Sequence, residues 1–339
     1  MTAQSSTSHQ RRPNLFVVGA PKCGTTSVCH YLDQHPEVFI STPKEPLFFC
    51  TDQQHDEPWR VSDPDRYLAL FEAGAGRRWR GEGSVWYLSS TIAARRIHNF
   101  SPDSRIVIML RNPVDMAVSL HAQFLFSGNE NIRDFEKAYS AQAARRRGRR
   151  IPWRAHMPEG LLYADVGRYA AQVERYLDVF PREHVKVLIF ETFFRDVAAG
   201  YRELLEFLDI DVEFAPDLAA KNERHNVRSA LLQRFLTKLP ELWGQPESAA
   251  AGGSRSTMRQ RLERARARLQ HFNMQGSSFR LTPDIRRRLH ADFADDIARL
   301  EALICRDLSV WRHRNLDGIA PGFPSGHSLV TGRTAHTEA

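Results

Sequence analysis

A glycine-rich loop between an apolar run and an amphipathic segment constrains this chain most strongly. Residues 15–18 (LFVV) have the composition of a short buried strand, and the loop at 19–26 (GAPKCGTT) follows at once. Apolar side chains then recur at helical spacing over residues 25–34. A strand, a loop and a helix in this order leave unpaired backbone N–H groups at the positive end of the helix dipole. The segment therefore predicts an anion-binding site.

The position of the lysine in this loop limits the anions that it can bind. A nucleotide triphosphatase has a lysine and then a serine or threonine after the second glycine, for the β- and γ-phosphates and magnesium. Here Thr25 follows Gly24, and the lysine is Lys22. Lys22 would face a single 5′-phosphate and the group bonded to it. The pattern therefore favours a nucleotide with a single 5′-phosphate over a nucleotide triphosphate. A small-molecule kinase and a plain Gly/Pro turn are the alternatives to this interpretation.

The rest of the chain alternates apolar runs with helical patterns. Residues 105–110 (RIVIML) and 185–190 (VKVLIF) have the composition of buried strands, and Asn112-Pro113 begins a helix at about 114–126. Further helical patterns cover 93–100, 133–147, 167–180, 197–208, 230–239, 258–272 and 282–308. This alternation predicts an α/β fold: a three-layer P-loop-type domain with a central parallel β-sheet flanked by helices, plus helical additions.

Length and composition favour one elaborated domain. We expect a disordered lead-in at 1–13, a single domain at 14–311 with a mobile loop at about 246–257, and a disordered tail at 312–339. The four cysteines have no metal-ligand spacing, which favours free thiols in a reducing compartment. The sequence shows no secretory signal and no apolar run long enough to span a membrane, so we expect a cytoplasmic protein.

Two motifs together resemble the PAPS-dependent sulfotransferases. The loop at 19–26 is similar to the 5′-phosphosulfate loop of that family, and residues 111–119 (RNPVDMAVS) look like its 3′-phosphate motif, in which an arginine and a serine bind the phosphate. The resemblance implies binding of 3′-phosphoadenosine-5′-phosphosulfate (PAPS), with PAP as the product. The residues implied in this binding are Pro21, Lys22, Cys23, Gly24, Thr25, Thr26, Arg111 and Ser119.

Further segments place the resemblance nearest to the heparan sulfate sulfotransferase type and its bacterial relatives. Residues 43–49 (PKEPLFF) look like its K-E-x-x-F-F segment, and 81–84 with Tyr87 is similar to its next block. Two positions depart from that type. Gly83 stands where those enzymes have a lysine, and Leu47 where they tend to have a histidine. Both departures weaken the case for a polyanionic sugar chain as acceptor.

The resemblance also implies a mechanism. The sulfuryl group would pass in line to a hydroxyl of a small-molecule, sugar or lipid acceptor, with no metal ion, while Lys22 neutralises the leaving oxygen. Glu45 would be the base, unless it merely pairs with Lys44, which is itself a candidate contact of the transferring group. His121 is the rival base, although a histidine on such a helix is more often packed or solvated.

The formal net charge of +7 favours anionic partners in general. Basic runs lie at 145–150 (RRRGRR) and 259–268. Each is read first as a solvated face, with contact to an acidic acceptor or to an anionic membrane surface as alternatives. A non-catalytic PAP-binding or nucleic-acid-binding protein is a further alternative. No recognition-helix or RNA-binding signature is visible, so we expect no nucleic-acid partner.

Overall fold

The computed structural model describes residues 12–54, 59–153, 155–218 and 281–312. At its centre, five strands pair in parallel in the order β2-β3-β1-β4-β5. They are β1 (Leu15–Gly19), β2 (Val38–Ile40), β3 (Trp79–Glu82), β4 (Arg105–Leu110) and β5 (Val185–Ile189). The three strands predicted from apolar runs are β1, β4 and β5, which are adjacent. Such runs suit a parallel sheet because both faces of its strands are covered.

Strands β2 and β3 are absent from the sequence prediction. Strand β2 has only three residues, and β3 carries Arg80 and Glu82 among its four. Neither segment shows the long apolar run of a central strand. Strand β3 nonetheless pairs with both β1 and β2, and Glu82 is fully buried. A charged side chain inside the sheet is therefore a feature that periodicity could not predict.

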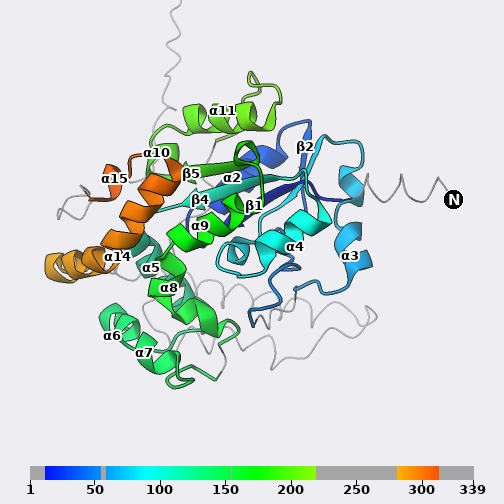
Figure 1. Cartoon of the computed structure of the whole chain (residues 1–339). Helices are drawn as coiled ribbons and strands as arrows, with labels where there is room; N and C mark the ends of the chain where they lie inside the picture. Colours follow the sequence, from blue (N-terminus) through cyan, green and yellow to red (C-terminus); the bar gives the residue numbers. More distant parts are fainter. Residues whose placement is uncertain (1–11, 55–58, 154, 219–280, 313–339) are drawn as a thin grey trace, which may run out of the picture.

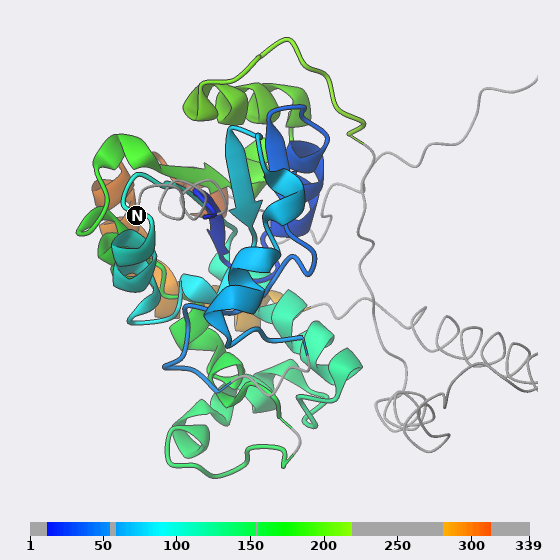
Figure 2. The ribbon, with the colours of Figure 1, turned by 90° about the vertical axis from the view of Figure 1, so that its right-hand side faces the viewer.

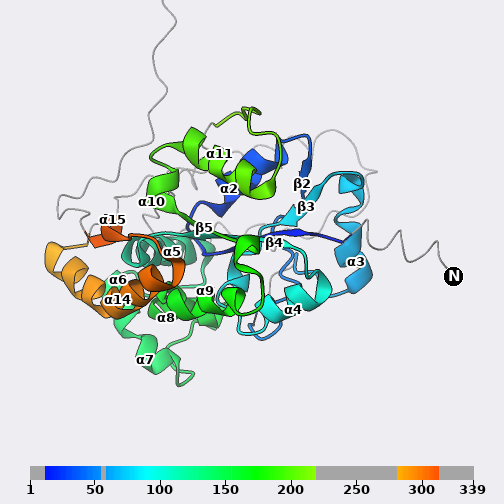
Figure 3. The same cartoon turned by 45° about the horizontal axis from the view of Figure 1, so that its top comes forward.

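Helices cover both faces of the sheet, which confirms the predicted fold class (Figures 1 and 3). On one side lie α2 (Thr25–Asp33), α10 (Phe190–Phe193) and α11 (Val197–Leu208). On the other lie α4 (Ala93–Phe100), α5 (Pro113–Ser127), α8 (Tyr163–Gly167), α9 (Ala170–Leu177) and α14 (Pro283–Ile304). The described part of the chain contains no helix with the length and apolarity needed to cross a bilayer.

Helix α14 and the short α15 (Ser309–Arg312) close the core. The buried side chains of α14 form the stripe expected from its spacing: Leu289, Phe293, Ile297, Leu300 and Ile304. Trp311 is fully buried; its indole donates to Glu191 at 2.8 Å, and its carbonyl accepts from the Asn112 side chain at 3.0 Å. These bonds tie the end of the described chain to α10 and to the turn between β4 and α5.

Two predicted helices differ from those of the structure. Residues 133–147 form α6 (Phe135–Ser140), after a cap by Asp134, and α7 (Gln142–Arg145). The pattern at 167–180 forms the shorter helix α9 (Ala170–Leu177), and its first residue, Gly167, ends the preceding α8, where a Cβ would lie 2.8 Å from the Phe293 ring. Helices α6 and α7 lie in a lobe beyond the two helical layers (Figures 1 and 2).

Several expectations lie outside the described residues. These are the lead-in up to residue 11, the helices at 230–239 and 258–272, the loop at 246–257, and the tail from residue 313. The remaining short elements are α3 (Pro64–Ala69) and the 3₁₀ turns at Glu72–Gly74, Val85–Tyr87, Pro158–Leu161 and Arg182–His184.

Candidate functional site

The predicted site residues follow the carboxyl ends of four neighbouring strands. Residues 20–24 follow β1, Arg111 follows β4, residues 41–49 follow β2, and residues 83–87 follow β3. In a parallel sheet these ends share one edge. The chain leaves β1 toward β2 and leaves β4 toward β5, so the strand order reverses between β1 and β4. Open α/β sheets bind ligands at such a switch point.

The loop after β1 presents backbone donors to this edge. Lys22 and Gly24 have positive φ of 62° and 86°. The N-cap residue of α2 is Gly24, not Thr25 or Thr26. No side chain caps this helix end. A Cβ at Gly24 would overlap the Phe194 ring, so glycine is required by space as well as by φ. The first N–H groups of α2 therefore have no side-chain acceptor at the cap.

The side chains of Pro21, Cys23 and Thr25 are buried. Burial raises the pKa of the Cys23 thiol to about 12, although Arg111 opposes the shift. Cys23 is thus a neutral thiol, and its Sγ lies 3.4 Å from the Pro21 carbonyl oxygen. These residues would serve an anion through their backbone, whereas Lys22 and Thr26 are only partly buried.

Arg111 joins the loop after β4 to the loop after β1. Its Nη1 donates to the Lys22 carbonyl at 3.3 Å, and its guanidinium lies 4.6 Å from the centroid of the Phe190 ring. The residue is 4% exposed, and its Nε is a buried donor with no hydrogen-bond partner among the described residues. A buried donor without a partner is costly, so this atom is a fitting contact for a phosphate oxygen.

Helix α5 separates the candidate residues that it carries. Lys22 Nζ donates to Gln123 Oε1 at 3.3 Å, which places Gln123 beside the loop. Ser119, one helical turn before Gln123, lies on the same face of α5, whereas His121 lies on another face. Gln123 was missed in the sequence, although its spacing of four from Ser119 was the available signal.

The structure gives His121 the contacts of a packed core residue. It is 1% exposed, its Nε2 lies 2.8 Å from the Ile132 carbonyl oxygen, and its ring packs against Phe135 and Tyr163. Burial lowers the pKa of its imidazole. This environment agrees with the packed alternative and not with a base at the sheet edge.

Glu45 and Lys44 form an ion pair beside β3. Lys44 Nζ lies 2.9 Å from Glu45 Oε1 and also donates to the Gly83 carbonyl at 2.9 Å. Burial opposes the charged form of Lys44, but Glu45 and its neighbours outweigh this effect and raise its pKa. The Glu45 side chain keeps 29% exposure, so the carboxylate is accessible from the edge.

Gly83 makes room for this pair. A Cβ there would lie 2.7 Å from Cys29 Sγ and 3.2 Å from Lys44 Cγ. The departure noted at position 83 therefore has a local reason, because the Lys44 side chain lies against the glycine. Leu47, Phe49 and Tyr87 are at most 2% exposed and belong to the core.

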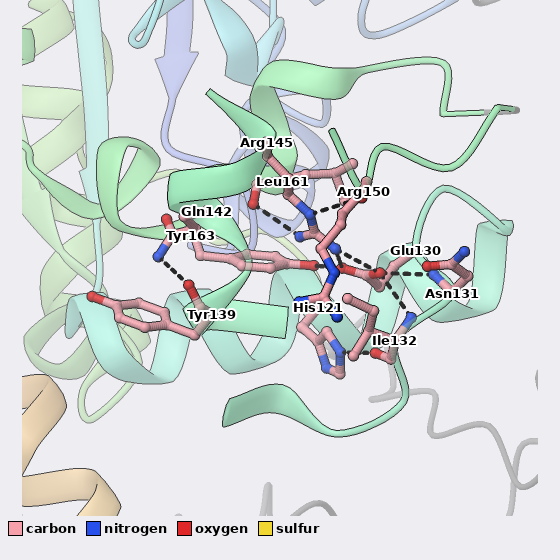
Figure 4. Close-up of polar contacts among 10 residues, drawn as sticks. All are labelled: His121, Glu130, Asn131, Ile132, Tyr139, Gln142, Arg145, Arg150, Leu161 and Tyr163. Carbon is pink, nitrogen blue, oxygen red and sulfur yellow. Dashed lines mark hydrogen bonds and ion pairs between the residues drawn. The ribbon is translucent and has the colours of Figure 1, made fainter. Parts of the chain in front are cut away.

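The arginine-rich run at 145–150 is divided between core and surface. Arg145 is buried and holds both oxygens of the buried Glu130, at 2.9 and 2.7 Å (Figure 4). Its remaining nitrogens donate to the carbonyls of Arg150 and Leu161. The reading of the whole run as a solvated face is thus wrong for Arg145, because its guanidinium holds the turn together. The other arginines of the run are exposed.

Arg145→Ala is expected to lower the free energy of unfolding by about 3–5 kcal/mol, because it leaves the Glu130 carboxylate buried without its partner. Arg146→Ala is the matched control. Arg146 pairs with Asp165 at the surface, where both side chains are more than 40% exposed, and its loss should cost less than about 1 kcal/mol. Urea unfolding followed by circular dichroism measures both, and equal costs would contradict this ranking.

Comparison with known proteins agrees with this geometry. A family model described as "Sulfotransferase domain" matches residues 12–234. The crystal structure of a sulfotransferase from Alicyclobacillus acidocaldarius is 34% identical, with a TM-score of 0.65 over 89% of this chain and 99% of that one.

Two curated human relatives are more distant. Heparan sulfate glucosamine 3-O-sulfotransferase 6 is 27% identical over 209 residues, which are 61% of this chain and 55% of that protein. Carbohydrate sulfotransferase 15 is 25% identical over 251 residues, which cover 58% of this chain and 44% of that protein. The chain thus spans about half the length of these relatives. With the family model and the bacterial structure in agreement, the chain belongs to the sulfotransferase domain family.

Proposed function

We propose that this protein transfers the sulfuryl group of PAPS to a hydroxyl group of an acceptor and releases PAP. The observation that carries the proposal is the contact between the two phosphate motifs. Arg111, just after β4, donates to the backbone of Lys22, just after β1, and its buried Nε has no partner in the part of the chain that the structure describes. A cation that joins the two loops at the switch point suits a nucleotide with phosphates at both its 5′ and 3′ positions.

The residues present fit this donor. The uncapped first turn of α2 offers N–H groups for the 5′-phosphate, and Arg111 with Ser119 offers a charged fork and a hydroxyl for the 3′-phosphate. A triphosphate would need a lysine after Gly24, where this chain has Thr25. This departure disfavours the kinase alternative.

The proposed chemistry divides between two sides of the site. PAPS, when bound, would supply the sulfuryl group, and the oxygen between sulfur and the 5′-phosphate would leave with PAP carrying the negative charge. Lys22 would neutralise that charge, and Gln123 holds its ammonium group at the edge. Glu45 would take the proton of the attacking hydroxyl, with Lys44 orienting its carboxylate.

A thermal-shift comparison tests the donor. Because a ligand that binds only the native state adds about 2.7 kcal/mol at 100 times its Kd, PAP should raise the Tm by several degrees. ATP with magnesium and a short oligonucleotide should leave the Tm within about one degree. A clear shift with ATP and magnesium, and none with PAP, would overturn the proposal in favour of a kinase.

The acceptor needs a separate search. The names of the two human relatives point to sugar hydroxyls, whereas Gly83 and Leu47 depart from the pattern of heparan sulfate enzymes. Incubation of cell extract with PAPS and the protein, followed by mass spectrometry, identifies compounds that gain one sulfate. Glucosamine-containing oligosaccharides and apolar alcohols make two defined sets for the same assay.

A further inference from the structure

The buried carboxylate of Glu82 lies at the centre of a hydrogen-bond network beneath the Glu45 segment. Glu82 ends β3 and is fully buried. Tyr67 and Tyr87 donate their hydroxyls to its Oε1 at 2.7 and 2.9 Å, and Ser84 donates to its Oε2. Burial of a carboxylate away from water costs free energy unless hydrogen bonds compensate for it, and the three hydroxyls supply these bonds.

Two of these hydroxyls also hold the segment that carries Glu45. The Ser84 hydroxyl accepts the Leu47 N–H at 3.1 Å. The Tyr87 hydroxyl accepts the N–H groups of Phe48 and Phe49 at 2.8 and 3.2 Å. The third hydroxyl, that of Tyr67, donates to Glu82 and makes no hydrogen bond to residues 47–49, which the structure describes in full.

The direction of these bonds depends on the charge state of Glu82. An ionised carboxylate only accepts hydrogen bonds, so each hydroxyl directs its proton toward Glu82 and its lone pairs toward the backbone. A side-chain amide in place of Glu82 would add two donors, and at least one hydroxyl proton would lose its acceptor. Burial raises the pKa of Glu82 to about 7, and the three hydroxyls act against this shift.

The segment needs such support because its backbone is strained. Leu47 has a φ of 56°, a left-handed conformation that a leucine rarely adopts, and it is 2% exposed. Conformations of this kind persist only where surrounding contacts fix them. The bond from Leu47 N–H to Ser84 is one such contact, two residues after Glu45.

We infer that Glu82 is the positioning residue of the proposed base. Through Ser84 and Tyr87 it fixes the backbone of residues 47–49, and thereby the place of Glu45 at the sheet edge. Glu82 itself is buried and takes no part in proton transfer to or from the acceptor. This role rests on the proposed function, since it matters for turnover only if Glu45 acts on an acceptor hydroxyl.

Two tyrosine variants separate positioning from simple packing. Tyr67→Phe and Tyr87→Phe each remove one hydroxyl from the same Glu82 oxygen, but only Tyr87→Phe also removes the acceptor of Phe48 and Phe49 N–H. Glu82→Gln is the third variant. Hydrogen exchange by mass spectrometry of the peptide covering 43–50 is measured on the full chain, with PAP affinity and with kcat for an acceptor found in the extract search.

Tyr87→Phe and Glu82→Gln should speed exchange in this peptide at least about tenfold and lower kcat at least about tenfold, because small displacements of a base are costly. PAP affinity should stay within about twofold, and Tyr67→Phe should resemble the wild type. Glu45→Gln should lose turnover with exchange unchanged.

The outcomes distinguish the two proposals. A wild-type chain that neither binds PAP nor transfers sulfate overturns the proposed function. An active wild type whose folded Tyr87→Phe and Glu82→Gln variants match it in exchange and in kcat overturns the role of Glu82. If Glu82→Gln does not fold, Ser84→Ala replaces it, since that change removes the acceptor of Leu47 N–H.

Discussion

Glu45→Gln should lower kcat by about 10²–10⁴-fold, the contribution typical of a positioned general base, while PAP binds within about twofold of the wild-type affinity. The amide keeps the shape of the side chain but cannot take a proton from an alcohol. The Lys44 side chain also bonds the Gly83 carbonyl, so it should hold its place without its carboxylate partner. Steady-state rates with the identified acceptor and calorimetric titration with PAP measure the two effects.

His121→Gln is the control that tests the rival base. A glutamine retains an N–H donor for the Ile132 carbonyl, and the folded variant should turn over at nearly the wild-type rate. The assignment to Glu45 is wrong if Glu45→Gln is fully active. Loss of turnover in a folded His121→Gln variant, with Glu45→Gln unaffected, would transfer the role to His121.

Arg111→Ala should weaken PAP binding by about 100-fold and abolish the preference for PAP over 5′-AMP. A charge-assisted contact to phosphate is among the stronger polar interactions, and loss of one partner of a buried pair costs about 2–5 kcal/mol. Because 5′-AMP lacks the 3′-phosphate, its affinity should change by less than about threefold. Calorimetric titration of both nucleotides measures the preference directly.

Arg105→Ala is the matched control for Arg111→Ala. Arg105 begins the strand that Arg111 follows, so it lies at the opposite edge of the sheet, where it donates to the Glu183 carbonyl. PAP affinity should be unchanged in this variant. If Arg111→Ala weakened PAP and 5′-AMP equally, Arg111 would hold the loop after β1 and would not recognise the 3′-phosphate.

The sequence predicts the donor half of the site better than the acceptor half. Lys22 and Arg111 each follow a strand made of an uninterrupted apolar run, so their shared edge follows from parallel topology alone. Strands β2 and β3 are too short and too polar to be recognised by pattern, and they carry Glu45 and Glu82 to that edge. Glu45 was therefore named as a base without the two strands that place it.

Buried charges are the second feature that sequence patterns do not reveal. Glu82 is bonded to hydroxyls from α3 and from the turn after β3, and Glu130 is held by an arginine that looked like part of a solvated run. Charged residues are almost never fully buried unless they are paired, and the partners of Glu82 and Glu130 come from other elements. Only the folded contacts distinguish Arg145 from its exposed neighbours.

The strand order β2-β3-β1-β4-β5 segregates the two halves of the proposed reaction along one edge. The loops after β1 and β4 lie side by side and would hold the nucleotide, whereas those after β2 and β3 lie side by side and carry the base with its support. Change in the second pair of loops can alter which hydroxyl is chosen while the nucleotide contacts stay intact. The same nucleotide-binding loops could in this way serve different acceptors, because only the loops after β2 and β3 need to change.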